Sequence, residues 1–149
     1  MTVGALCTRK VVSAPRDTTV AAAAQLMRKR HVGDVVVVNS VRGRMVPVGI
    51  ITDRDIVLSV IAPQLDPQVF TIGDMLLRPA LVCREEDNVS ACLGAMRVNA
   101  IRRMPVVDRK GALAGIVTVD DLVRFLSGQL ESVSRLIARE QSVERKTRR

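Results

Sequence analysis

The chain carries one sequence unit twice, and this repeat limits its fold more than any other feature. The stretch GIITDRDIV at 49–57 returns as GIVTVDDLV at 115–123. Seven of the nine aligned positions hold the same residue or an aliphatic substitute. A unit repeated at a fixed spacing indicates that the copies pack on each other, because one copy is too small to bury its own apolar surface.

The match extends upstream of these stretches. An offset of 69 residues places Gly4 on Gly73, and it also aligns the segments before each GI stretch. The offset falls to 66 at the GI stretches, and a loop tolerates such a length change at little cost. The sequence therefore predicts a first repeat at 1–62, a second at 70–127, and a linker at 63–69 that contains two prolines.

Each repeat is predicted to run strand, helix, strand, strand, helix. A β-branched run at 35–38 predicts a buried strand, and apolar residues at helical spacing within 20–30 predict an amphipathic helix behind the N-cap Thr19. The expected elements are strands at 11–13, 35–38, 48–51, 81–83, 104–107 and 114–117, and helices at 20–30, 89–98, from Thr52 and from Thr118. This order predicts an α/β fold of mixed α+β character, with a small sheet packed on two helices in each repeat.

The segment 128–149 is predicted to be an amphipathic helix with a basic tail. An apolar stripe continues out of the second repeat through Leu122, Phe125, Leu126, Leu130, Val133, Leu136 and Ile137. Coverage by the chain's own module and contact with a second copy are both open. The net charge is +8, and about half of this excess lies in the tail, where a solvated surface is the simplest interpretation.

Composition excludes several classes of function. No apolar run is long enough to span a membrane, and no secretory signal is evident. Cys7, Cys83 and Cys92 align with Leu76, Ala14 and Ala23, which indicates buried apolar positions and a reducing cytoplasm. His31 is the only histidine, so neither a metal site nor a catalytic set is expected, and the chain is not expected to be an enzyme.

The paired motifs resemble a known family. The GIITDRD and GIVTVDD stretches, the helix ends MRKRHV and MRVNAI, and the strands VVVN and PVVD are similar to a tandem pair of CBS domains, known as a Bateman module. The chain is most similar to small stand-alone bacterial members, and the resemblance covers about 1–127. It implies a pseudo-two-fold pair of repeats with clefts that bind adenine nucleotides or related adenosyl ligands, and it implies a homodimer.

The Thr-x-x-Asp elements are the candidate binding motifs. Thr52 and Asp55 follow one strand, and Thr118 and Asp121 follow its counterpart. An ionised carboxylate accepts hydrogen bonds from the vicinal hydroxyls of a ribose, and the resemblance assigns this role to the aspartates. The same spacing is also a capping box, which is purely structural, and the two roles can coexist.

The two sites are expected to differ. Arg102 and Arg103 precede the middle strand of the second repeat, where the aligned residues of the first are Gly33 and Asp34. Because phosphate needs cations, the stronger site is predicted to combine Arg102, Arg103, Thr118 and Asp121. The site around Thr52, Arg54 and Asp55 is predicted to be weaker, empty or specific for another ligand. In the resemblance the base lies against the residues after the first strand, which are Ser13, Ala14 and Pro15 in one repeat and Cys83 and Arg84 in the other.

The function predicted from these features is a regulatory ligand sensor. AMP, ADP or ATP is the expected ligand, with NAD or S-adenosylmethionine as further possibilities and no obligatory cofactor. An unidentified protein target would respond to the conformational change. The alternative is a scaffold or nucleic-acid-binding protein that acts through the basic tail and the run at 28–30, although no motif of a nucleic-acid-binding fold supports it.

Overall fold

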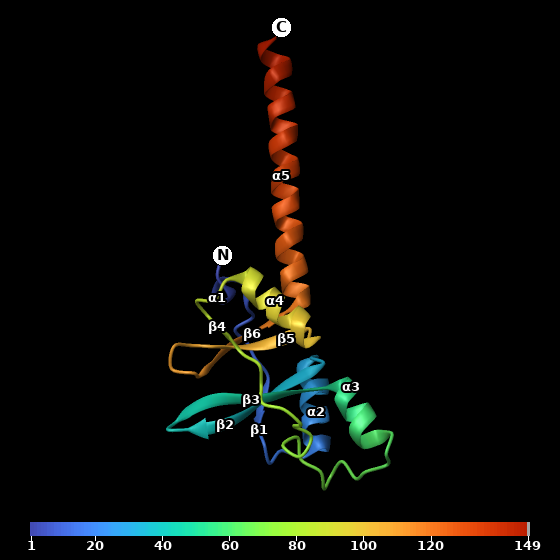
Figure 1. The fold of residues 1–149 in the computed structure, drawn as a ribbon. Helices are drawn as coiled ribbons and strands as arrows, with labels where there is room; N and C mark the ends of the chain where they lie inside the picture. Colours follow the sequence, from blue (N-terminus) through green and yellow to red (C-terminus); the bar gives the residue numbers. More distant parts are fainter. Residues whose placement is uncertain (149) are drawn as a thin grey trace.

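The computed structural model describes residues 1–148 and has the predicted order of elements in both repeats, preceded in the first repeat by one short helix that was not predicted (Figure 1). The first repeat contains α1 (Val3–Leu6), β1 (Ser13–Pro15), α2 (Val20–Arg30), β2 (Asp34–Val41), β3 (Arg44–Thr52) and α3 (Asp53–Ile56), which continues as a π-helical turn over Val57–Ile61. The second contains β4 (Cys83–Arg84), α4 (Val89–Asn99), β5 (Arg103–Val107), β6 (Leu113–Thr118) and α5 (Val119–Thr147).

Each repeat builds one three-stranded mixed sheet. The strand orders are β1-β2-β3 and β4-β5-β6, and in both sheets the first pair is parallel and the second antiparallel. The two antiparallel pairs also shift register at equivalent positions, between Val37 and Val38 in the first sheet and between Val106 and Val107 in the second. The predicted α/β class with two small sheets is therefore confirmed.

The middle strand of the first repeat shows how the layers are arranged. Val35 and Val37 pack in a core with α2, whereas Val36 and Val38 pack in a separate cluster with Ile116 of the second sheet. Successive side chains of a strand point to opposite faces, so β2 is buried on both sides. Each sheet consequently has helices on one face and the other sheet on the opposite face (Figure 1).

Two strand predictions were displaced, and the second helix of the first repeat, whose start after Thr52 was predicted, is short. β1 begins at Ser13 because the parallel ladder starts there, opposite Val36, while Val11 packs between the sheets. β4 is reduced to the two residues that pair with Val106 and Val107. The helix that begins after Thr52 is α-helical only to Ile56, whereas its counterpart α5 runs for 29 residues.

The first segment of each repeat packs on the other repeat. Val3 and Leu6 belong to the core of the second repeat, and Ile72 and Leu76 belong to the core of the first. Equivalent backbone contacts hold both segments, since the Gly4 amide donates to the Glu85 carbonyl at 2.9 Å and the Gly73 amide donates to the Arg16 carbonyl at 2.9 Å. The two repeats are therefore interlocked.

Helix α5 leaves the rest of the chain after its first turns (Figure 1). Leu122 and Phe125 pack in the core of the second repeat, but the side chains of the stripe from Leu126 onward are exposed. The predicted stripe thus divides into a part covered by the chain's own module and a part that is not. Within residues 1–148, no helix combines the length and the apolar composition that crossing a membrane would need.

Candidate functional site

The two Thr-x-x-Asp elements have the same local structure. Thr52 donates from its amide and from its hydroxyl to Oδ2 of Asp55, both at 2.8 Å, and its Oγ1 accepts from the Asp55 amide at 3.1 Å. Thr118 and Asp121 repeat these three hydrogen bonds at 2.9, 2.8 and 3.2 Å. Both elements are complete capping boxes, so each Thr and Asp has a structural role.

The second carboxylate oxygen distinguishes the two aspartates. Oδ1 of Asp121 lies 3.4 Å from the Arg124 guanidinium, and the side chain is almost fully buried. Oδ1 of Asp55 has no hydrogen-bond or ion-pair partner within residues 1–148, and Asp55 is only half-buried. Asp55 can therefore accept hydrogen bonds from a ligand without losing its role in the capping box.

Asp55 lines a cavity of about 700 Å³ between the two repeats. One wall is formed by β3 with Ile50, and another by the segment 75–81, which includes Arg78 and Leu81. The end of α4 and Arg103 close it from the side of the second repeat. A volume of this size, lined by apolar side chains with several polar and charged groups among them, is typical of small-molecule sites in proteins.

Arg103 is held at this cavity by an ion pair with Asp34. The two residues are related by the 69-residue offset, and each begins the middle strand of its sheet. Their side chains are 32% and 20% exposed, respectively. This cross-repeat contact turns the guanidinium toward the first repeat, so the cation lies at the same cavity as Asp55.

This grouping differs from the predicted one. The sequence predicted that Arg103 would share a site with Thr118 and Asp121, but in the structure Arg103 lines the same cavity as Asp55. The physical reason is the interlocked arrangement, in which the start of β5 faces the Thr-x-x-Asp element of the other repeat. Arg102 is exposed and does not line this cavity, and the same is true of Arg54.

The region around Asp121 is closed by backbone pairing. Thr8 and Ile116 exchange two hydrogen bonds, each of 2.9 Å, so the segment after α1 lies directly on β6. The position equivalent to Ser59, which lines the Asp55 cavity, is Phe125, and its ring packs on the core of the second repeat. Leu77, the counterpart of Thr8, makes no such pair and is 92% exposed.

The residues predicted to contact a base lie apart from the cavity lining. Ser13 is half-buried in β1, where it pairs with Val36, and Ala14 is buried in the core. Pro15 and Arg84 are exposed at the ends of β1 and β4. Cys83 is buried 2.8 Å from the Cys92 sulfur in the second core. The sequence interpretation of Cys83 and Cys92 as buried small residues agrees with this packing.

The two buried thiols perturb each other. The hydrogen bond that Cys83 donates to Cys92, together with burial, raises the pKa of the Cys83 thiol far above its ordinary value. The same hydrogen bond lowers the pKa of Cys92. Their counterparts in the first repeat are Ala14 and Ala23, which fill the equivalent core positions, so the packing itself requires only small side chains.

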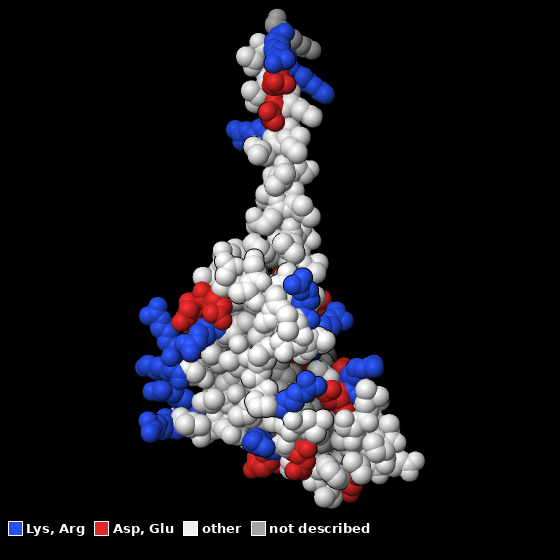
Figure 2. Space-filling model, viewed as in Figure 1, with Lys and Arg blue, Asp and Glu red and all other residues white. Residues whose placement is uncertain are grey.

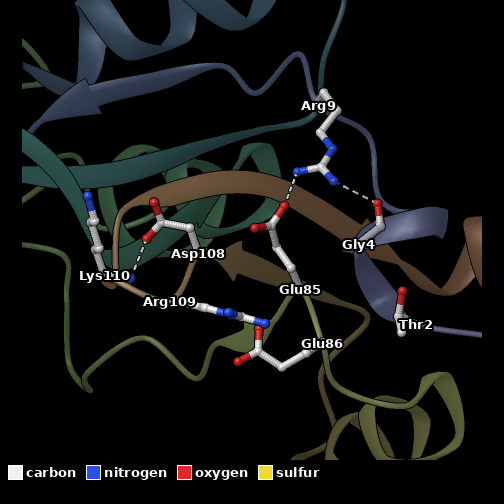
Figure 3. Close-up of a pocket in the computed structure, with 8 residues that line it drawn as sticks. All are labelled: Thr2, Gly4, Arg9, Glu85, Glu86, Asp108, Arg109 and Lys110. Carbon is white, nitrogen blue, oxygen red and sulfur yellow. Dashed lines mark hydrogen bonds and ion pairs between the residues drawn. The ribbon is translucent and has the colours of Figure 1, made fainter.

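A second hollow, of about 540 Å³, lies near the N-terminus (Figure 3). Two of its charged groups are engaged with each other, because Arg9 forms an ion pair with Glu85, and Arg9 also donates to the Gly4 carbonyl at 2.8 Å. The Lys110 amide donates to Asp108 at 2.8 Å. Arg9 is the counterpart of Arg78, which makes no ion pair within the described residues and lines the Asp55 cavity.

Sequence reasoning missed Ser59 and Arg78 as cavity residues. The sequence repeat contained the information needed to find Arg78. The segment that contains Arg78 packs on the first repeat, so Arg78 lies next to β3 and not next to β6 of its own repeat. A metal centre has no candidate among residues 1–148, where no three His, Cys, Asp or Glu side chains lie together in a way that could hold an ion.

Comparison with known proteins agrees with this architecture. An uncharacterized protein of Methanopyrus kandleri is 33% identical over 83% of the chain, and the chain spans 62% of that protein's length. The solved CBS domain protein of Pyrobaculum aerophilum, complexed with AMP, is 27% identical with a TM-score of 0.73, over 82% of this chain and 90% of that one. A CBS domain pair complexed with 5′-methylthioadenosine and S-adenosyl-L-methionine is 25% identical with a TM-score of 0.71, over 85% and 99%.

The family model for the CBS domain matches the chain twice, at residues 3–62 and 72–128. Both matches contain a Thr-x-x-Asp element and a three-stranded mixed sheet. The chain therefore belongs to the CBS domain family and contains a tandem pair of these domains.

Proposed function

We propose that this protein is a regulatory module that binds an adenosyl ligand in the cavity between Asp55 and Arg103. The observation that carries the proposal is the combination, on one cavity, of a guanidinium and a carboxylate oxygen that has no partner within residues 1–148. These are the groups that a nucleoside monophosphate requires, because it presents hydroxyl donors at one end and an anion at the other.

Each part of such a ligand has a complementary wall. The ribose hydroxyls would donate to Oδ1 of Asp55, while Oδ2 stays in the capping box. The adenine base would lie against the apolar side chains of Ile50 and Leu81, and the phosphate would approach Arg103 and Arg78. Arg103 is already paired with Asp34, which tempers its attraction for phosphate. AMP, with a single phosphate, therefore suits the cavity better than ADP or ATP.

The related structures support an adenosyl ligand. One contains AMP and another contains 5′-methylthioadenosine and S-adenosyl-L-methionine, and both share the fold over more than four fifths of this chain. What these ligands have in common is adenosine, so recognition of the base and ribose is the shared feature. NAD remains a further candidate, since it also carries an adenosine monophosphate unit.

The regulatory part of the proposal follows from the position of the cavity. Its lining comes from both repeats, so a ligand that fills it would bind more tightly to one relative arrangement of the repeats than to another. Only such a differential affinity can shift a conformational equilibrium. A protein target would then respond to the shift, and the ligand would be released unchanged. The three free thiols suit a reducing compartment, such as the cytoplasm.

The pseudo-symmetry offers a matched test by calorimetric titration with AMP. Asp55→Asn should weaken AMP binding by roughly tenfold or more, because hydrogen bonds to a charged acceptor contribute about 1.5–3 kcal/mol. Asp121→Asn makes the same change in the equivalent capping box, where the second oxygen faces Arg124. It should lower thermal stability comparably and leave AMP affinity within about twofold.

Either of two results would exclude the proposal. Equal loss of affinity in both variants would place binding outside the Asp55 cavity. An absence of AMP, S-adenosylmethionine and NAD binding to folded wild-type protein would leave both Thr-x-x-Asp elements as helix caps alone.

A further inference from the structure

Helix α5 carries an exposed apolar stripe beyond the point where it leaves the CBS pair. We define the α5 stripe as Leu126, Leu130, Val133, Leu136, Ile137 and Val143. These side chains are between 49% and 72% exposed, and none belongs to a core cluster of the described chain. Figure 2 shows the shaft of the helix as a largely uncharged surface between the body and the charged tip.

The free part of α5 has few means of stabilising itself. It contains Gly128 and several serines, which are weaker helix formers than alanine, and Ser132 donates to the Gly128 carbonyl at 2.9 Å rather than packing on a neighbour. A helix segment of this length in water is marginal even with a favourable sequence, and proteins usually stabilise such helices by burying an amphipathic face. The α5 stripe therefore requires a covering surface.

We propose that the α5 stripe packs against the same stripe of a second copy of this chain, as a parallel two-stranded coiled coil. The residues of the stripe follow a seven-residue pattern. Leu126 and Val133 occupy position a, Leu136 and Val143 occupy position d, and Leu130 and Ile137 flank the seam at position e. The uncovered stripe extends over roughly 26 Å at 1.5 Å per residue, which is the length of a short coiled coil.

Charge complementarity favours a second copy in the parallel orientation. In this register Arg139 occupies position g and Glu144 position e of the next heptad, a pairing that forms salt bridges across parallel helices. Glu140, at position a, would face Glu140 of the second copy across the seam, and Arg139 of the second copy would lie beside it and offset the like charges. Neither Arg139 nor Glu140 has an ion-pair partner within residues 1–148 of its own chain, whereas Glu144 lies 3.4 Å from the Arg148 guanidinium of its own chain at an exposed position. The two-fold axis forms each contact twice.

An anionic membrane is the strongest competing partner for an amphipathic helix with basic residues. The acidic side chains argue against it, because Glu140 lies along the seam and would approach the lipid headgroups. A second copy satisfies both signs of charge, whereas an anionic surface satisfies only one. The inference does not depend on the identity of the ligand.

The test is the oligomeric state of the full chain by sedimentation equilibrium. Wild-type protein should have twice the mass of the chain. Leu136→Glu places a charge in the seam and should weaken dimerisation at least tenfold. Ala138→Glu adds the same charge at position f, on the outer face, and should remain dimeric. The melting of the CBS pair should be similar in both variants, because residue 136 lies outside its cores.

The orientation is tested by Gln129→Cys, at position d. Parallel helices bring this residue next to its own copy, so mild oxidation should produce a covalent dimer that wild-type protein does not form. A dimer without this cross-link would overturn the parallel register. A wild-type monomer at high micromolar concentration, or a Leu136→Glu protein that remains dimeric, would overturn the proposal. Monomeric protein that sediments with phosphatidylserine vesicles would assign the stripe to a membrane surface.

Discussion

Asp34 and Arg103 carry opposite charges at equivalent positions, and this difference breaks the symmetry of the two repeats. The residues occupy equivalent positions, yet one is an acid and the other a base, and they pair across the repeats. Two like charges at these positions would repel each other across the repeats. The observed pair gives the guanidinium to the Asp55 cavity and leaves the region of Asp121 without it.

The residue-scale prediction concerns Asp34→Asn. Removing this carboxylate frees Arg103 for a phosphate, so AMP affinity should rise roughly three- to tenfold, since charge-assisted hydrogen bonds are about twice as strong as neutral ones. Adenosine, which has no phosphate, should bind as before. The free energy of unfolding should fall by only about 0.5–1 kcal/mol, because the pair is partly exposed. Calorimetric titrations with the two ligands measure both effects.

The Arg103→Gln variant provides the complementary control. It should lose affinity for AMP and keep affinity for adenosine. If Asp34→Asn changed adenosine and AMP equally, Arg103 would not face the phosphate, and the ion pair would only join the repeats.

At the scale of elements, two close backbone contacts hold the first segment of each repeat against the other repeat. A Cβ atom added at Gly73 would lie 2.7 Å from the Arg16 carbonyl oxygen, and one at Gly4 would lie 2.9 Å from the Glu85 carbonyl oxygen. Backbone atoms cannot move aside as a side-chain end can. These two glycines therefore permit the amide–carbonyl contacts that join each segment to the other repeat.

Gly73→Ala is consequently expected to destabilise the protein by about 1–3 kcal/mol, the usual cost of forcing extra volume into a packed site. Gly94→Ala is the matched control, because it adds a methyl group inside α4 where no atom lies within 4 Å. It should stabilise the protein by up to about 1 kcal/mol, since alanine is the better helix former. Chemical denaturation of both variants measures the difference, and a neutral Gly73→Ala would show that the segment can shift without cost.

The elements also show what the sequence could and could not predict. The limits of α2 were predicted correctly because both its cap Thr19 and its apolar spacing are local signals. The capping boxes at Thr52 and Thr118 were predicted for the same reason. The first strands were displaced because their extent depends on pairing with a central strand, which is not local. The position of Arg103 at the cavity of Asp55 was missed because it follows from the way the first segment of each repeat packs on the other repeat.

At the scale of the whole molecule, the residues of one sequence repeat and the residues of one hydrophobic core are different sets. The core of the first repeat includes Ile72, which is fully buried, together with Phe70, Met75 and Leu76 from the start of the second repeat. The core of the second includes Val3 from the beginning of the chain. A cut at the boundary between the sequence repeats should therefore leave both cores incomplete, since each core includes residues from the other repeat.

This difference predicts the behaviour of two fragments. The fragment 11–78 contains every residue of the first core, whereas the fragment 1–62 lacks Ile72 and its neighbours and retains Val3 without its binding surface. Burying one large aliphatic side chain contributes about 1.5–3 kcal/mol, so losing several removes most of the stability of a small domain. We expect a cooperative thermal transition by circular dichroism for 11–78 and none for 1–62. Ile72→Ala should abolish the transition of 11–78, and a stable 1–62 would show that the sequence repeat folds without the first segment of the other repeat.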